Sequence, residues 1–255
     1  MIYGLYLSAQ GAETQAFRQT VLANNMANAG TTAFKPDIPL FRAHFPHDVV
    51  HLNQNNVPES LERQSGGVEL VGTTTDHRQG PLNVTNAPLD LAVVGSGFLQ
   101  ISSGSETYLT RNGRMTLDAA GAIVSADDGA TLLSTDGQPI TVPPETQHIA
   151  IAADGVVNGV GADGTSIPLG QVAIVEPDDY ASLIKHGDSH YTTAGGVQPA
   201  VTAQLRQGVI EESVTNPVDG MVELIQTARA FEMNMNMMRY QDEMLGQLIQ
   251  SVPRR

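Results

Sequence analysis

The chain has no cysteine and no tryptophan, and aromatic residues make up only 5% of its 255 positions. Without cysteine it can form no disulfide, no thiolate zinc site, no iron–sulfur cluster and no cysteine nucleophile. Its stability must therefore come from packing. Because large rings are so scarce, we expect that packing to rest on Val, Ile, Leu and Ala.

Positive charge is also scarce. Thirteen Lys and Arg residues stand against 27 Asp and Glu residues, which gives a formal net charge of -14. An acidic surface repels nucleic-acid phosphates and anionic lipids, so we expect no nucleic-acid partner. No run reaches the roughly 18 apolar residues of a membrane-spanning helix, so we expect no membrane insertion. Glu13 and Arg18 interrupt the apolar stretch that a cleaved secretory signal would need before Ala27-Asn28-Ala29, and we expect no such signal.

A helix is predicted at the N-terminus, because the segment from Ile2 to Ala29 has no proline and only two glycines. A spacing of four then three residues selects a narrow stripe of mostly small side chains: Leu5, Ala9, Ala12, Ala16, Gln19, Ala23 and Met26. Gly30 is expected to end this helix in the left-handed conformation.

A longer helix is predicted at the C-terminus. Thr215 or Asn216 can cap it, and Pro217 fits its first turn. The same spacing selects a stripe in which nine of ten residues are apolar: Met221, Leu224, Ala228, Phe231, Met235, Met238, Asp242, Leu245, Ile249 and Val252. Met233 and Met237 fall beside this stripe, where a second neighbouring helix could contact them.

The middle of the chain has short alternating or β-branched runs separated by turn pairs such as Asn112-Gly113 and Asp136-Gly137. The predicted fold class is α+β, with the terminal helices paired as a coiled-coil stalk and a central antiparallel all-β domain. The predicted parts are an N-terminal assembly helix (1–30), an extended connector (31–67), the β domain (68–207) and a C-terminal assembly helix (208–255). A two-helix stalk buries little apolar area, so we expect other copies or other chains to complete it.

The sequence contains only weak candidates for a metal site or a dinucleotide-binding site. His44, His47 and His51 have helical metal-ligand spacing, but Pro46 argues against a helix there, and we expect solvated histidines and no metal. Gly95-Ser96-Gly97 follows a predicted strand but lacks the third glycine and the helix of a dinucleotide loop, so a hairpin turn is the better interpretation.

Two acidic pairs, Asp127-Asp128 and Asp178-Asp179, lack the alternating pattern of a calcium loop and are interpreted as turn residues. Ser96 has no hydrolase motif around it. We therefore expect no catalytic residues, no cofactor and no enzymatic activity.

Three ordered blocks of sequence stand out along the chain. The first runs Asn24-Asn25-Met26-Ala27-Asn28-Ala29-Gly30-Thr31-Thr32-Ala33-Phe34-Lys35. The second comprises Gln79-Gly80-Pro81-Leu82, Asn86-Ala87-Pro88-Leu89-Asp90-Leu91-Ala92-Val93-Val94-Gly95-Ser96-Gly97-Phe98 and Leu109-Thr110-Arg111-Asn112-Gly113. The third comprises Gln207-Gly208-Val209-Ile210-Glu211-Glu212-Ser213, Asn216-Pro217-Val218 and Ala228-Arg229-Ala230-Phe231-Glu232-Met233.

Together these three blocks resemble the flagellar rod and hook protein family. This resemblance implies a structural subunit of the bacterial flagellar basal body, located in the periplasmic rod. It also implies export through the flagellar secretion apparatus and polymerisation, through the terminal helices, with other rod subunits or with further copies of itself. The Ala228–Met233 block is closer to the proximal-rod F type than to the distal-rod G type, which stays an alternative together with a hook-type subunit. Ala33 departs from the family pattern, where glycine is usual.

Two other classes remain open, a secreted β-domain enzyme and a monomeric binding module. An enzyme needs convergent polar groups that the sequence does not assemble, and a monomeric module would not need apolar stripes at both ends. Self-association of the full chain would discriminate between these classes and an assembly protein.

Overall fold

The computed structural model describes residues 2–43, 67–104 and 106–251. Contacts divide the chain into two compact units. The first, called here the helical unit, comprises residues 1–27, 37–76 and 216–255, and the second, the β unit, comprises residues 28–36 and 77–215. Two long helices and many antiparallel strands confirm the predicted α+β class. Within the described residues, neither helix has an apolar stretch sufficient to cross a membrane.

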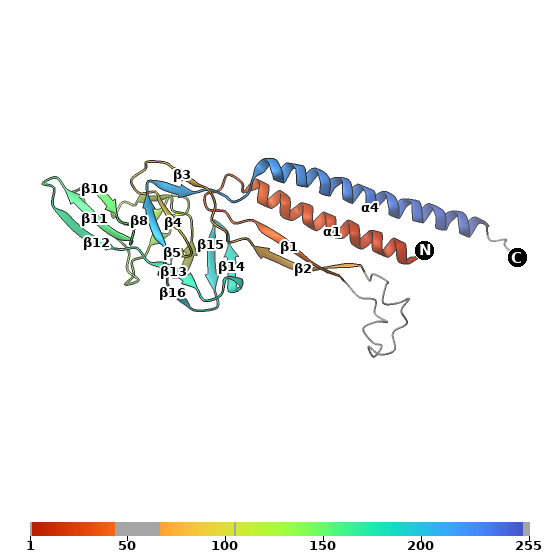
Figure 1. The fold of residues 1–255 in the computed structure, drawn as a ribbon, viewed down its shortest axis with the longest axis horizontal. Helices are drawn as coiled ribbons and strands as arrows, with labels where there is room; N and C mark the ends of the chain where they lie inside the picture. Colours follow the sequence, from red (N-terminus) through yellow and green to blue (C-terminus); the bar gives the residue numbers. More distant parts are fainter. Residues whose placement is uncertain (1, 44–66, 105, 252–255) are drawn as a thin grey trace. The chain divides into compact units, whose positions relative to one another are not determined.

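The helical unit contains α1 (Ile2–Ala27) and α4 (Pro217–Ser251), which lie side by side in opposite directions (Figure 1). Gly4 of α1 faces Gln241 of α4, and Gly11 faces Asn234. About two turns further along α1, Arg18 forms an ion pair with Glu223 of α4. The order of these contacts shows that the two helices pack antiparallel.

The ends of both helices test the predicted caps. The side-chain oxygen of Asn216 accepts a hydrogen bond from the Val218 N–H at 3.0 Å, which confirms Asn216 as the cap of α4. The predicted end of α1 at a left-handed Gly30 is wrong. The helix stops at Ala27, and the left-handed conformation falls instead on Ala33, with a φ of 55°.

A strand pair completes the helical unit. β1 (Asp37–Ala43) pairs antiparallel with β2 (Val68–Thr75), with a register shift between Leu40 and Phe41. Residues 68–75 are predicted to belong to the β domain and residues 37–43 to a connector, whereas contacts group both strands with the helices. His44, His47 and His51 lie outside the described residues.

Among its described residues, the β unit has sixteen short strands and one 3-10 turn, η1 (Tyr180–Ser182). The strands are β3 (Leu82–Val84), β4 (Leu91–Val94), β5 (Phe98–Ser103), β6 (Glu106–Thr110), β7 (Met115–Leu117), β8 (Ile123–Ser125), β9 (Thr131–Leu132), β10 (Thr146–Ile151), β11 (Val156–Gly161), β12 (Ser166–Gln171), β13 (Ile174–Pro177), β14 (Leu183–His186), β15 (His190–Thr193), β16 (Val197–Pro199), β17 (Gln204–Gln207) and β18 (Val209–Glu211).

These strands pair antiparallel in four sheets. The largest follows the order β14-β15-β6-β5-β9-β8-β7, with β13 pairing with β5 and β16 beside it. The others are β10-β11-β12, β17-β4 and β18-β3. Because β4 and β5 belong to different sheets, the expected hairpin at Gly95-Ser96-Gly97 is wrong. The two glycines, with φ of 98° and 130°, make a turn that carries the chain from one sheet to the next.

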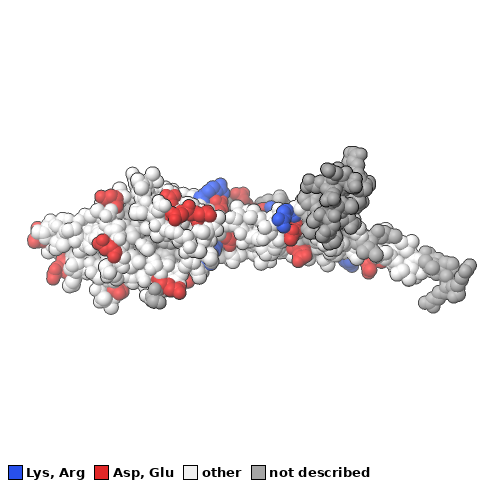
Figure 2. All heavy atoms as spheres, turned by 90° about the horizontal axis from the view of Figure 1, so that it is seen from below, with Lys and Arg blue, Asp and Glu red and all other residues white. Residues whose placement is uncertain are grey.

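The core of the β unit is largely aliphatic, as the composition predicted. Its main cluster includes Leu91, Val93, Leu99, Ile101 and Ile123, all fully buried. A second, smaller cluster is built on Phe98, Leu109 and Tyr191. On the surface shown in Figure 2, acidic side chains lie in separate small groups among uncharged atoms, and basic side chains are few.

Candidate functional site

The face of α4 that packs against α1 differs in part from the predicted stripe. One predicted column, Leu224, Phe231, Met238 and Leu245, is partly buried. The second buried column lies one residue earlier than predicted and is polar: Thr227 is buried, and Asn234 and Gln241 are partly buried. Because Gly4 and Gly11 of α1 carry no side chain, the amide groups of Gln241 and Asn234 fit against that helix.

The remaining predicted interface residues are divided between packed and open positions. On α1, Ala12 is buried, Leu5, Ala16 and Met26 are partly buried, and Ala9 and Ala23 are exposed. On α4, Ala228 is partly buried, whereas Met221, Met235 and Ile249 are exposed. Pairing with α1 therefore accounts for part of the predicted stripe and leaves the rest uncovered.

A second apolar stripe runs along the exposed side of α4, away from the side that packs against α1. We call it the outer face; its seven residues are 45 to 66% exposed. They are Val222, Ile225, Met233, Met237, Tyr240, Met244 and Leu248. Successive members are separated by three, four or eight positions, which places them on one side of a helix. Residue spacing predicts Met233 and Met237 as contact residues beside the stripe, and it gives no prediction for the other five residues of this face.

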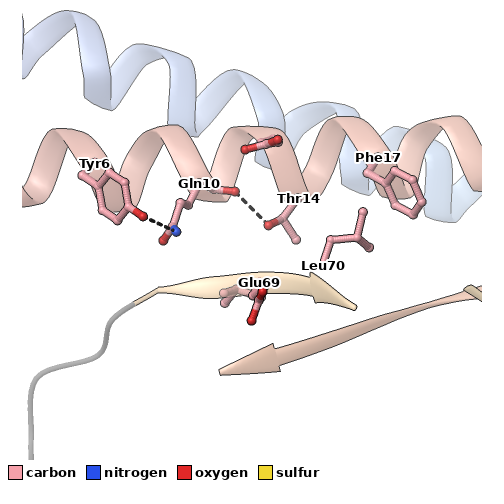
Figure 3. Close-up of a pocket in the computed structure, with 8 residues that line it drawn as sticks. Tyr6, Gln10, Thr14, Phe17, Glu69 and Leu70 are labelled. Carbon is pink, nitrogen blue, oxygen red and sulfur yellow. Dashed lines mark hydrogen bonds between the residues drawn. The ribbon is translucent and has the colours of Figure 1, made fainter. Parts of the chain in front are cut away.

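The helical unit also has an open cleft of about 490 Å³ between α1 and β2 (Figure 3). Tyr6, Gln10 and Phe17 line one side and Glu69 and Leu70 the other. Within it the Gln10 amide donates to the Tyr6 hydroxyl at 2.9 Å. These side chains form a mixed polar and apolar lining, and the lining residues do not include a nucleophile paired with a base.

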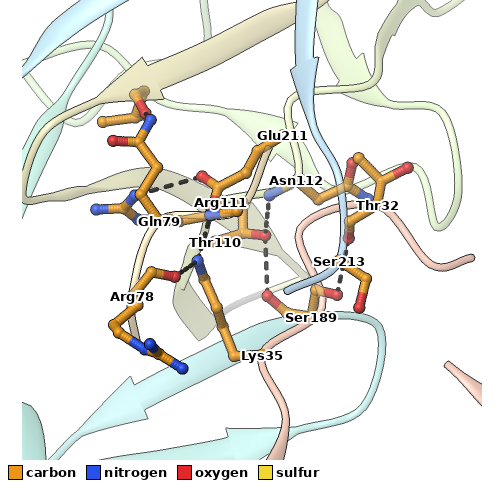
Figure 4. Close-up of polar contacts among 12 residues, drawn as sticks. Thr32, Lys35, Arg78, Gln79, Thr110, Arg111, Asn112, Ser189, Glu211 and Ser213 are labelled. Atoms are coloured by element: carbon orange, nitrogen blue, oxygen red, sulfur yellow. Dashed lines mark hydrogen bonds and ion pairs between the residues drawn. The ribbon is translucent and has the colours of Figure 1, made fainter. Parts of the chain in front are cut away.

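In the β unit, residues of the three family blocks meet around one buried carboxylate, Glu211 (Figure 4). Its Oε1 accepts hydrogen bonds from the Lys35 Nζ at 2.5 Å and from the Gly80 N–H at 2.7 Å. Its Oε2 lies 3.3 Å from Nη1 of Arg111. Lys35 comes from the first block, Gly80 and Arg111 from the second, and Glu211 from the third.

The two cations of this Glu211 centre have further partners. The Lys35 Nζ donates to the carbonyl oxygen of Arg78 at 2.5 Å, and Nη2 of Arg111 donates to that of Gly95 at 2.6 Å. The Arg111 guanidinium also lies over the Phe98 ring, 5.4 Å from its centroid. The side chains of Lys35 and Glu211 are 0% exposed. Buried charges persist only when paired and hydrogen-bonded, so each member of the centre depends on the others.

The backbone around Lys35 is held on several sides. The Ala33 N–H donates to the carbonyl oxygen of Glu211 at 2.8 Å, and the Val214 N–H donates to that of Phe34 at 3.3 Å. Lys185 on β14 donates to the carbonyl oxygen of Lys35 at 2.7 Å, and its Nζ lies 4.6 Å from the centroid of the Phe34 ring. Residues 33–35 are therefore fixed from both the β14 side and the Glu211 side.

The turn after β14 adds one more contact to this segment. Asp188 and Ser189 both have positive φ, 54° and 59°, a conformation that is uncommon for residues other than glycine. The Ser189 hydroxyl donates to the carbonyl oxygen of Thr32 at 3.2 Å, and the Ser189 carbonyl accepts from the Thr110 hydroxyl at 3.0 Å. The strained turn thus joins the first family block to the end of β6.

Other residues of the family blocks form hydrogen bonds that fix the local backbone. In the helical unit, the Asn25 side chain exchanges two hydrogen bonds with the Asp37 backbone, at 2.8 and 3.0 Å, while Asn24 is exposed. Asn28 accepts from the Thr31 N–H at its carbonyl oxygen.

In the loop before β4, the Asp90 carboxylate accepts from the Thr85 hydroxyl at 2.6 Å, and the Pro88 carbonyl accepts from the Gln207 amide at 2.6 Å. Leu89 packs against the main core. These contacts give the block residues structural roles.

The sites considered in the sequence have ordinary structural partners. Asp127 accepts a hydrogen bond from the Asn112 side chain at 2.7 Å, and Asp179 caps η1. Ser96 lies 3.4 Å from the Thr202 hydroxyl. Across the part of the chain that the structure describes, no three His, Asp or Glu side chains are grouped to hold a metal ion.

Comparison with known proteins gives two matches to family models. The flagellar hook protein FlgE/F/G D1 domain matches residues 92–159, and the flagellar basal body rod FlgEFG protein C-terminal matches residues 206–251. The first match contains Arg111, and the second contains Glu211 and all of α4.

Individual relatives are similar over almost the whole chain. The flagellar basal-body rod protein FlgF of Caulobacter vibrioides is 33% identical over 240 residues, covering 92% of this chain and 91% of the relative. The rod protein FlgG of Buchnera aphidicola subsp. Acyrthosiphon pisum is 32% identical, with coverages of 98% and 100%. FlgF of Salmonella typhimurium is 30% identical, with coverages of 96% and 96%. The resemblance indicated by the three blocks is confirmed, and the chain belongs to the flagellar basal-body rod protein family.

Proposed function

We propose that this chain is a structural subunit of the periplasmic flagellar rod, which assembles with other rod subunits through its terminal helices. Family membership and the uncovered outer face of α4 support this proposal. The Ala228–Met233 block favours the proximal-rod position of the F type. The distal position of the G type is the second candidate, because relatives named FlgF and FlgG are 33% and 32% identical to the chain.

The outer face provides the driving force for assembly. Burying one exposed Leu, Met or Ile side chain stabilises an association by up to about 1.5–3 kcal/mol. Large contiguous apolar surfaces on a folded chain mark interaction sites, and a surface rich in methionine adapts to more than one neighbour. Met221, Met235 and Ile249 enlarge the apolar surface available to neighbouring helices.

The pairing of α1 with α4 continues in the assembly as a coiled coil. In such a pair, polar residues at seam positions fix the register at a cost in stability. Thr227, Asn234 and Gln241 occupy these positions here, so the pair is specific but weak. Neighbouring subunits supply the missing stabilisation.

The chain reaches the rod through the flagellar export apparatus, and it acts there mechanically, without catalysis, metal or cofactor. A glutamate at Met237 tests this function, because assembly would bury an unpaired charge at a cost of several kcal/mol. Gln250→Glu is the matched control, since it adds the same charge at an exposed position off the outer face.

Both variants are expressed in cells that lack the native gene. We expect Met237→Glu to give folded, soluble protein and non-motile cells, while Gln250→Glu restores swimming. Normal swimming with Met237→Glu would refute the role of the outer face.

A further inference from the structure

We propose that the Glu211 centre makes two distant chain segments become ordered together. The entry segment, residues 28–36, follows α1, and the exit segment, residues 208–215, precedes α4. Both belong to the β unit. This coupling is a property of the single chain and does not depend on whether the chain polymerises.

The entry and exit segments contact each other directly, although Lys35 and Glu211 are 176 positions apart. The Ala33 N–H binds the Glu211 carbonyl, the Val214 N–H binds the Phe34 carbonyl, and the two side-chain charges form an ion pair. No strand is assigned within residues 28–36, so the entry segment has no ladder of its own to hold it.

Electrostatics makes this contact cooperative. When the entry segment leaves, Glu211 loses one of its two cations while its carboxylate is fully buried. When the exit segment leaves, the buried ammonium of Lys35 loses its carboxylate. A buried charge without its counter-charge is strongly unfavourable, so loss of either segment destabilises the other. Thermodynamic linkage requires the effect to be equal in both directions.

Backbone strain acts in the same direction. Ala33 has a φ of 55° and is fully buried, a conformation that persists only when the surroundings enforce it. Its N–H is bonded to the Glu211 carbonyl. Without the exit segment, fewer contacts hold the entry segment in this conformation. A chain that lacks the exit segment therefore holds the entry segment, which follows α1, less firmly.

Amide hydrogen exchange in the full-length chain tests this coupling. The informative amides are those whose hydrogen bonds do not cross between the segments: Glu212 N–H, bonded to the Pro81 carbonyl, and Phe34 N–H, bonded to the Thr31 carbonyl. In Lys35→Met we expect exchange of the Glu212 amide to accelerate by at least about a hundredfold, the size expected for breaking a buried pair. In Glu211→Gln we expect the same for the Phe34 amide.

The matched control is Arg42→Met, which removes the cation of an exposed pair with Glu69. We expect it to leave both reporter amides unchanged. Acceleration confined to the mutated segment would overturn the proposal. If a variant fails to fold, native-state exchange of the wild-type chain in low denaturant decides. If the Phe34 and Glu212 amides exchange through one opening, with the same rate and the same dependence on denaturant concentration, the two segments are coupled. Two different dependences on denaturant concentration would overturn the proposal.

Discussion

Replacing Glu211 with glutamine changes one oxygen to an amide group and removes the negative charge from the Glu211 centre. The side chain keeps its shape and can still accept from the Gly80 N–H. Lys35 and Arg111 then lose the negative charge that Glu211 supplies. The amide oxygen, in the place of Oε1, still accepts from Lys35, and the new NH2 group, in the place of Oε2, faces the Nη1 donor of Arg111 at 3.3 Å. The substitution therefore removes the charge of this side chain while keeping its shape and packing nearly unchanged.

The expected loss follows from this burial. Removing one partner of a buried pair costs about 3–5 kcal/mol, because the other charge is left uncompensated. Two pairs share the carboxylate, and their losses are not additive, since both depend on the same desolvated site. We expect Glu211→Gln to lower the free energy of unfolding by about 3–5 kcal/mol, a large part of the roughly 5–15 kcal/mol typical of folded proteins.

Urea unfolding followed by near-ultraviolet circular dichroism measures this loss, because Tyr180 and Tyr191 pack with Phe98 in the β unit and report on its tertiary structure. Glu69→Gln is the control, since Glu69 and its partner Arg42 are 47% and 68% exposed and such pairs contribute at most about 1 kcal/mol. A loss for Glu211→Gln no larger than that of the control would contradict the stabilising role of the buried charge.

Three further substitutions test separate parts of the structure. Gly113→Ala places a methyl group onto the Leu91 carbonyl oxygen, so we expect a fall in the free energy of unfolding of about 1–3 kcal/mol or more; an unchanged thermal midpoint would contradict this close approach. Asn216→Ala removes the cap of α4 and should cost about 1 kcal/mol, measured from the helical circular dichroism signal on heating. Burial and the hydrogen bond to Glu176 raise the pKa of Tyr180 above the ordinary 10.0. The neutral phenol therefore stabilises the folded chain fully below pH 10, and this contribution to the free energy of unfolding should be lost as the pH rises through the raised pKa. Phenolate absorbance should show Glu176→Gln lowering that pKa, and an unmoved titration would exclude the hydrogen bond.

Local patterns were sufficient to predict the two helices. Spacing and capping residues are read along the chain, and both depend on contacts within a few positions. The second packed column of α4 was predicted one residue too late because hydrophobicity favoured Met235 over Asn234. What places Asn234 against α1 is a glycine on the other helix, Gly11, more than two hundred positions away.

Partner choice among segments could not be predicted. The strand Asp37–Ala43 pairs with Val68–Thr75 across 24 intervening residues, and alternation of residue types does not specify the partner of a strand. The family blocks identified Lys35 and placed Glu211 within a motif. Their meeting in one buried centre depends on the tertiary fold, so the sequence pattern contained no signal for it.

Electron cryomicroscopy of purified basal bodies would locate this chain and its outer face in the assembled rod. We expect the chain to occupy the rod, with α1 and α4 paired and Met233, Met237 and Met244 in contact with helices of neighbouring subunits. Rod density that excludes the chain, or that leaves these three methionines facing solvent, would contradict this expectation.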